Sequence, residues 1–221
     1  MGGLESLALA VGSAWAAGIN LYATILVLGV MDLFGLAVLP DELAVLSSPM
    51  VLGAAALLFC IEFVADKIPG VDSLWDMLHT FIRIPAGAYL AASTAAGMDF
   101  GLPEETAYIA ALLVGGAISG GSHLSKATSR AAINTSPEPF TNWFASFVED
   151  IFAVGAVILA VFAPVVLLSF VGVFILLAVW LLPKLIRTLV RLFRGRKPEE
   201  EAGSGLVMQA DRAPGQLDPP D

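Results

Sequence analysis

The chain has 221 residues, of which 57% are hydrophobic and 14% are charged, with 11 Lys and Arg against 20 Asp and Glu. Its mean hydropathy of +0.84 is far from that of a soluble domain, in which about a quarter of the residues are charged. The net charge of −9 disfavours nucleic-acid binding, which needs a basic surface, and a single cysteine, Cys60, excludes an internal disulfide.

Six apolar segments are long enough to cross a bilayer, which takes roughly 20 helical residues. The first is uncharged between Glu5 and Asp32, and we interpret it as a retained span because no basic region precedes it. The uncharged stretch 151–183 is too long for one span, so a turn is predicted near Ser169 to Gly172. The other five spans are predicted at about 42–62, 75–98, 106–125, Phe140 to beyond Pro164, and 171–192. The fold class is therefore all-α and polytopic.

The charges outside these spans are asymmetric. With six spans, all Lys and Arg residues fall on or near one side, and basic residues are retained in the cytoplasm. We therefore predict a multi-pass protein of the bacterial inner membrane with both termini cytoplasmic. Residues 1–197 form the transmembrane domain, and the polar segment 198–221 is expected to be a disordered cytosolic tail. The opposite side receives only acids: Asp32, Asp41, Glu42, Asp99, Glu104 and Glu105.

Two segments, about 49–98 and 117–166, resemble each other when shifted by 68 residues, as from Gly53 to Gly121. Each is an apolar helix, a turn marked by proline, and a helix led by Trp75 or Trp143. Internal repeats are common in transporters. This repeat is parallel if every segment spans the membrane, and differently related if the proline-led segments are re-entrant. Chance similarity of Gly- and Ala-rich sequence is the alternative explanation.

Charged residues recur at helical spacing within the spans. Asp72, Asp76, His79 and Arg83 fall on one helical stripe. Ionisable residues in a span normally face the protein interior and have partners. We therefore predict that Arg83 pairs with Glu149 or Asp150. The corresponding partner of Arg130 is Glu62 or Asp66.

These residues form a candidate substrate or ion pathway, or else structural ion pairs between the two copies. The predicted pathway residues are Glu62, Asp66, Asp72, Asp76, His79, Arg83, His123, Lys126, Arg130, Glu149 and Asp150. Three amides are predicted as helix contacts or pathway residues: Asn20, which interrupts the first span, Asn134 and Asn142.

A metal centre or an enzyme is disfavoured. Asp72, Asp76 and His79 have spacing compatible with metal ligands, and His123 could add a donor, but Arg83 shares their stripe. Ser122 precedes His123 without the glycine elbow of a nucleophilic hydrolase. We therefore predict no metal, no cofactor and no catalytic residue, and keep a carboxylate- and histidine-bound metal enzyme as the least favoured hypothesis.

The stretch from Glu62 to Asp76, followed by Arg83 to Gly87, resembles the multi-pass bacterial membrane family catalogued as domain of unknown function 4126. The resemblance covers about residues 4 to 195 and implies a membrane protein with no established activity. It extends to Gly18–Tyr22 and to His123, Lys126, Arg130, Asn134, Ser136 and Pro137.

A fainter similarity links Lys67–Val71 and Pro85–Gly87 to DedA membrane proteins. That similarity implies transport of polyprenyl-phosphate lipid carriers. The chain departs from the DedA pattern at Asp72, where an arginine is expected, which puts phosphate binding in doubt.

The sequence favours a transporter-like protein with a charged, cytoplasm-facing cavity that moves a small solute, an ion or proton, or a lipid head group. Counted with Glu138 and Lys67, seven acids face four bases in this region, which favours protons or cations over phosphate. Its predicted partners are the lipid bilayer and such a solute, without nucleic acid, and a homo-oligomer is compatible with the sequence. The alternative is a non-transporting scaffold whose buried charges are structural salt bridges.

Overall fold

A computed structural model describes residues 2–96, 98–135 and 139–194, and all regular structure in these ranges is helical. The all-α prediction is therefore confirmed. The chain divides into two compact units, 1–183 and 184–221, and the following description concerns the first. The predicted tail 198–221 lies outside the described residues, as do Ser136, Pro137, Glu138, Arg196 and Lys197.

The first predicted span consists of two helices instead of one. Helix α1 (Gly3–Ile19) ends at Asn20, and α2 (Leu21–Leu33) begins at the next residue. Asn20 has an extended backbone, and its side-chain oxygen accepts a hydrogen bond from the Ala23 N–H at 2.9 Å. Asparagine is among the best residues for capping a helix N-terminus. Asn20 therefore ends one helix and starts the next.

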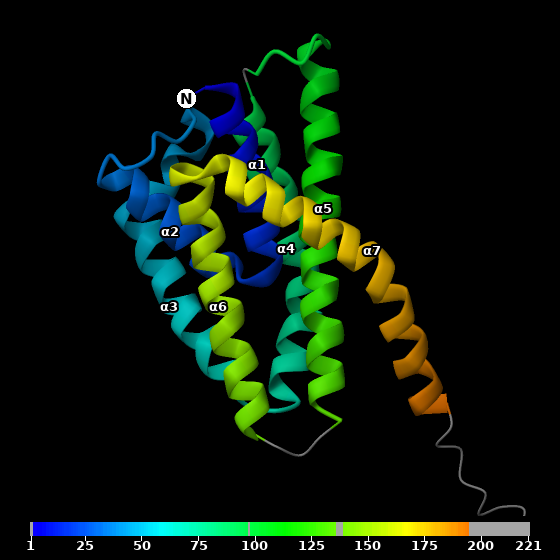
Figure 1. Ribbon diagram of the computed structural model, residues 1–221. Helices are drawn as coiled ribbons and strands as arrows, with labels where there is room; N and C mark the ends of the chain where they lie inside the picture. The colour runs from blue at the N-terminus through cyan, green and yellow to red at the C-terminus, as the bar shows by residue number, and fades with distance from the viewer. Residues whose placement is uncertain (1, 97, 136–138, 195–221) are drawn as a thin grey trace, which may run out of the picture. The chain divides into compact units, whose positions relative to one another are not determined.

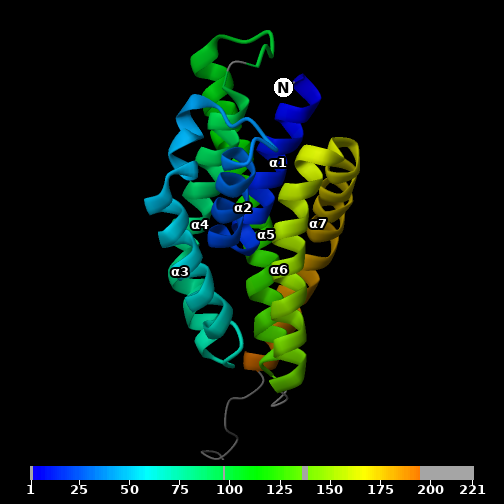
Figure 2. The same ribbon diagram turned by 90° about the vertical axis from the view of Figure 1, so that its left-hand side faces the viewer.

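Helices α1 and α2 are antiparallel and form a hairpin (Figures 1 and 2). Leu7 near the start of α1 shares a cavity with Phe100, whereas Gly18 near its end packs against Ser119 in the middle of α5. Helix α2 then returns, so that Gly29 packs against Leu46, just before α3 begins. The prediction of one crossing between Glu5 and Asp32 is wrong, and the six-crossing count that put both termini on one side no longer holds.

The other helices follow in chain order. A short 3-10 helix, η1 (Asp41–Ser47), leads into α3 (Pro49–Ala65), whose N-terminus is capped by the Ser48 side chain. The predicted turn near Ser169 to Gly172 is wrong. The break is at Ala163, because Pro164 lacks an N–H and suits the first turn of a helix. The remaining helices are α4 (Val71–Ala95), α5 (Glu104–Ile133), α6 (Pro139–Phe162) and α7 (Pro164–Arg194).

Several helices are suited to a membrane. Helices α5, α6 and α7 are long and apolar enough to cross it, and η1 with α3, bent by 65°, forms a fourth candidate. The chain is therefore a helical membrane protein. By length and composition, the described residues give three or four candidate spans against the six predicted. Helix α4 is also long, at 25 residues, but carries Asp72, Asp76 and Arg83.

Small residues bring α1, α4 and α5 close together. A Cβ on Gly115 of α5 would meet the Cβ of Ala91 on α4, and a Cβ on Gly87 of α4 would meet the Ser119 side chain. Such contacts let helix backbones approach each other in lipid. Small residues thus permit the close approach of α4 and α5 at these positions.

Candidate functional site

The predicted pathway residues of α3, α4, α5 and α6 converge in the interior. We call the central seven the ion-pair cluster. Six of them are at most 3% exposed, and the side chain of Glu149 is 16% exposed. The helical stripe predicted in α4 is confirmed, since Asp72, Asp76, His79 and Arg83 are all buried. The ion-pair cluster consists of Glu62, Asp66, Asp76, Arg83, Lys126, Arg130 and Glu149.

Arg83 bridges two acids. Its Nη2 lies 2.5 Å from Glu62 Oε1, and its Nη1 lies 2.8 Å from Asp76 Oδ1. Pairing with Glu149 or Asp150 was the wrong prediction, because α6 packs mainly on α1 and α2. The nearest acids are instead Glu62 on α3 and Asp76, which lies two turns before Arg83 on the same face of α4.

Lys126 lies at the centre of the cluster. Its Nζ is 2.7 Å from Asp66 Oδ2, and it also donates a hydrogen bond to the backbone oxygen of Ile19 at 3.2 Å. Three other carboxylates, those of Asp76, Glu62 and Glu149, lie 3.5–3.7 Å from the same nitrogen. The Lys126 ammonium group therefore forms ion pairs with carboxylates from α3, α4 and α6.

Arg130 connects α5 to α3 and α6. Its Nη2 is 2.6 Å from Glu149 Oε2, and its Nη1 donates to Asn142 Oδ1 at 2.5 Å and to the backbone oxygen of Asp66 at 3.1 Å. The predicted Arg130–Asp66 ion pair is present at 3.7 Å, although Glu149 is closer. Asn142 is a helix contact here.

The junction of α1 and α2 at Asn20, which we call the hairpin tip, contacts the ion-pair cluster through Lys126. Asn20 is fully buried, and its Nδ2 donates to Asp150 Oδ1 at 2.9 Å, which confirms the predicted contact with another helix. Ile19 is the last residue of α1, so no further turn of α1 supplies a donor for its carbonyl oxygen. Ser122 donates to the backbone oxygen of Trp15 at 2.8 Å, and Lys126 donates to that of Ile19. Non-helical backbone at membrane depth is tolerated where protein surrounds it in this way.

His79 bonds to α2. Its Nδ1 is 2.8 Å from the Trp75 carbonyl oxygen and therefore carries the hydrogen, which leaves Nε2 to accept from the Tyr22 hydroxyl at 3.0 Å. Sequence reasoning missed Tyr22. Its position two residues after the helix break was the available signal.

His123 is also neutral in the bonding pattern. Arg83 Nη1 is 3.3 Å from His123 Nδ1 and can only donate, so the hydrogen is on Nε2, 2.7 Å from Thr80 Oγ1. Thr80 in turn donates to the backbone oxygen of Asp76 at 3.0 Å. Thr80 was not predicted as a site residue, because threonines in apolar helices commonly bond to the backbone of their own helix.

The predicted metal-compatible set does not converge. The Asp72 carboxylate accepts from Asn134 Nδ2 at 2.9 and 3.0 Å, Asp76 faces Arg83, and His79 faces Tyr22. In the described part of the chain, no group of three or more His, Cys, Asp or Glu residues is arranged to hold a metal ion. Asp72 and Asn134 instead connect the start of α4 to the end of α5.

Lys67 marks the edge of the cluster, in the turn between α3 and α4. Its Nζ donates to the Phe63 carbonyl oxygen at 3.0 Å and lies 3.5 Å from Ser146 Oγ. Partial burial lowers the pKa of Lys67, while the nearby Asp150 carboxylate raises it. The Lys67 side chain is half-buried and extends from the turn toward Ser146 of α6.

Acids outnumber cations in this interior. Glu62, Asp66, Asp72, Asp76, Glu149 and Asp150 face three permanent cations, Arg83, Lys126 and Arg130. Four buried carboxylate oxygens have no hydrogen-bond partner: Glu62 Oε2, Asp66 Oδ1, Asp76 Oδ2 and Asp150 Oδ2. Isolated negative charge is costly inside a protein and more so in a membrane. These unpartnered carboxylate oxygens can therefore bind protons or small cations.

Comparison with known proteins gives one informative result. No curated protein and no solved structure matches the chain significantly. The similarity to DedA proteins therefore stays a prediction. The sequence profile described as "Domain of unknown function (DUF4126)" matches residues 7–184, which include the hairpin and the whole ion-pair cluster. The chain belongs to this DUF4126 family.

Proposed function

We propose that this protein is a multi-pass transporter of the bacterial inner membrane that couples protonation of its buried acids to movement of a small solute. The observation that carries the proposal is the excess of buried acids over cations around the hairpin tip. Full ionisation would leave a net negative charge among apolar helices, so bound protons are the simplest compensation. Proton coupling requires carboxylates that can take up a proton from water and release it again.

The α1–α2 hairpin supports this function. Broken helices whose ends meet at the middle of the bundle form the binding sites of many transporters. Here, the start of α2 and the end of α1 meet Asp150 and Lys126. Motion of the hairpin would change the partners of both residues. The two hollows near the start of α5, described below, are lined by residues outside the ion-pair cluster, so opening of the cluster toward the Lys67 turn is part of the proposed cycle.

The orientation follows from the charges. We place the turn at Lys67 in the cytoplasm, in accordance with the positive-inside rule, and the acidic segments near Glu42 and Glu104 outside. Because the hairpin returns to its own side, this orientation puts the N-terminus outside. The C-terminal basic segment, Lys184 to Lys197, is assigned to the cytoplasm, as the sequence predicts.

Cysteine accessibility tests this orientation. With Cys60→Ser as background, a membrane-impermeant maleimide should label Gly3→Cys and Glu42→Cys in right-side-out vesicles. It should label Ile68→Cys only in inside-out vesicles, since the start of α1 and the turn between α3 and α4 lie at opposite ends of the bundle (Figure 1). Labelling of Gly3→Cys and Ile68→Cys from the same side would refute the hairpin topology.

Proton uptake by proteoliposomes containing an internal pH dye tests the function. Under an imposed membrane potential, we expect uptake above that of empty liposomes, and a loss of at least about tenfold in Asp76→Asn and Asp150→Asn, because ionisable residues inside membranes carry proton relays. The matched control is Asp41→Asn with Glu42→Gln, which removes two exposed acids outside the cluster. Equal uptake in all variants would eliminate the proposed coupling.

A scaffold is the second candidate, and it is favoured by the dense pairing of Arg83, Lys126 and Arg130 with acids. Infrared spectroscopy of the carboxyl groups distinguishes a scaffold from a transporter. A transporter should contain protonated carboxyl groups that exchange with deuterium oxide, and the band should shrink in Asp150→Asn. A scaffold predicts proton-tight liposomes and no exchanging band.

A further inference from the structure

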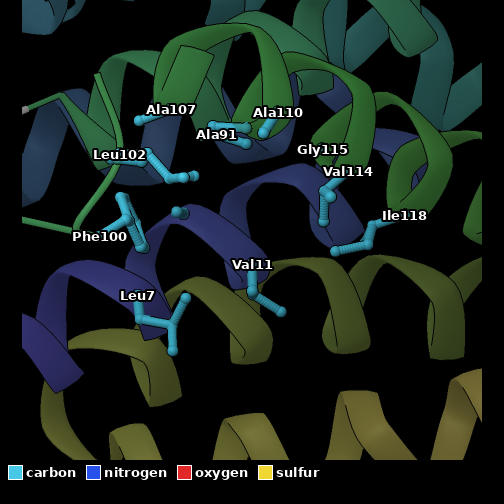
Figure 3. Close-up of a pocket in the computed structure, with 13 residues that line it drawn as sticks. Leu7, Val11, Ala91, Phe100, Leu102, Ala107, Ala110, Val114, Gly115 and Ile118 are labelled. Carbon is cyan, nitrogen blue, oxygen red and sulfur yellow. The ribbon is translucent and has the colours of Figure 1, made fainter. Parts of the chain in front are cut away.

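A separate cavity (Figure 3) lies near the start of α5, at the opposite end of the bundle from the turn between α3 and α4 (Figure 1). Its volume is about 200 Å³, and α1, α4, α5 and the loop before α5 enclose it. Leu7 and Val11 of α1 face Val114 and Ile118 of α5 across it, and Phe100 lies at one end. No charged side chain is among the residues that line it, and it is larger than an engineered cavity of about 150 Å³ that binds benzene.

Alanines create this space. Ala91, Ala107 and Ala111 line the cavity where larger residues would fill it, and Gly115 contacts Ala91 at its wall. One turn beyond, Ser119 donates to the backbone oxygen of Arg83 at 3.0 Å. The cavity therefore ends just short of the ion-pair cluster.

The outer end of the cavity is acidic. A second hollow of about 630 Å³ shares Ala95, Leu102 and Ala107 with the first and is also lined by Asp99, Glu104 and Glu105. Tyr108 lies beside these acids and offers an aromatic face. Together, the two hollows fall within the range of about 300–1,000 Å³ typical of small-molecule sites.

Within the described part of the first unit, no base lies beside these acids. The cations within residues 2–96, 98–135 and 139–183 are Lys67, Arg83, Lys126 and Arg130, and all four belong to the cluster or its edge. Residues of one sign around an apolar cleft concentrate ligands of the opposite sign. The anionic phosphate of an ordinary phospholipid is repelled from this mouth, whereas an ammonium group is attracted.

We infer that this composite cavity binds a hydrophobic ammonium ion, with its apolar part between α1, α4 and α5 and its cationic head at Asp99, Glu104, Glu105 and Tyr108. Carboxylates supply charge complementarity, and a tyrosine ring adds a cation–π contact. This binding does not depend on whether the ion-pair cluster moves protons. Equilibrium binding is therefore the appropriate test, and its outcome is distinct from that of proton uptake.

The experiment titrates decyltrimethylammonium into the full-length protein in phosphatidylcholine nanodiscs, with empty nanodiscs subtracted. We expect saturable binding at least about tenfold tighter than that of neutral decyl maltoside, equivalent to about 1.4 kcal/mol of charge recognition. Decyl sulfate should not bind. Glu104→Gln with Glu105→Gln should bring the affinity for the cation close to that for the neutral probe.

Two further variants complete the test. Asp41→Asn with Glu42→Gln removes the same charge at exposed positions outside the cavity and should leave binding unchanged. Ala111→Leu, which fills the apolar part, should weaken both the cationic and the neutral probe. Equal affinity for the two probes would reduce the cavity to an acyl-chain site and overturn the inference. An equal loss of binding in both acid-removing pairs would also overturn it.

Discussion

Replacing Arg83 by methionine should destabilise the protein by about 3–5 kcal/mol, the range expected when one partner of a buried ion pair is removed. Arg83 is fully buried and holds both Glu62 and Asp76, so its loss leaves two carboxylates without their nearest cation. The free energy of unfolding measured by steric trapping in bicelles gives the magnitude.

Two companion variants identify the cause. Adding Glu62→Gln and Asp76→Asn to Arg83→Met should recover most of the lost stability, because the two carboxylates that lost their nearest cation are then neutral. Lys67→Met, which removes a half-buried cation at the edge of the cluster, should cost no more than about 1 kcal/mol. If Arg83→Met costs no more than Lys67→Met, the central position assigned to Arg83 is incorrect.

The second large effect is expected at Gly18, where the end of α1 lies against α5. A methyl group there would overlap Ser122 Oγ and the Ser119 carbonyl oxygen, and a backbone atom cannot rotate away. Gly18→Ala should therefore cost about 3 kcal/mol, at the upper end of the range for overpacking. It should also break the bond from Ser122 to the Trp15 carbonyl oxygen.

Gly121 provides the matched control in the neighbouring helix. A Cβ there meets no atom within 4 Å, so Gly121→Ala should instead stabilise the protein by up to about 1 kcal/mol through helix propensity. Thermal unfolding of the two variants in the same detergent compares them directly. A similar change in both would show that α1 does not approach α5 as closely as described.

Local periodicity was sufficient to predict the buried stripe of α4. Residues three and four apart must share a helix face, so Asp72, Asp76, His79 and Arg83 are buried together wherever α4 packs. The partner of Arg83 was not predictable in the same way, because it depends on which helix packs beside α4. Only the three-dimensional arrangement brings Glu62 to this position.

Hydropathy alone also concealed the hairpin. The mean hydropathy of a window of residues measures how strongly the segment prefers lipid to water. It contains no information on the direction in which the chain runs. The polar sequence at Gly18 and Asn20 signalled an interruption but not the reversal after it. Prolines were similarly ambiguous, since Pro164 begins α7 while Pro85 and Pro183 lie inside helices.

The hairpin has a consequence for biogenesis. Asn20 bonds to Asp150, which the ribosome adds 130 residues later, and side chains of α5 bond to the carbonyl oxygens of Trp15 and Ile19 near the end of α1. Until those later segments emerge, the tip would expose bare peptide groups to hydrocarbon. The amino-terminal hairpin must therefore wait at the bilayer surface or within the insertion machinery, and it can dock only after most of the chain has been translated.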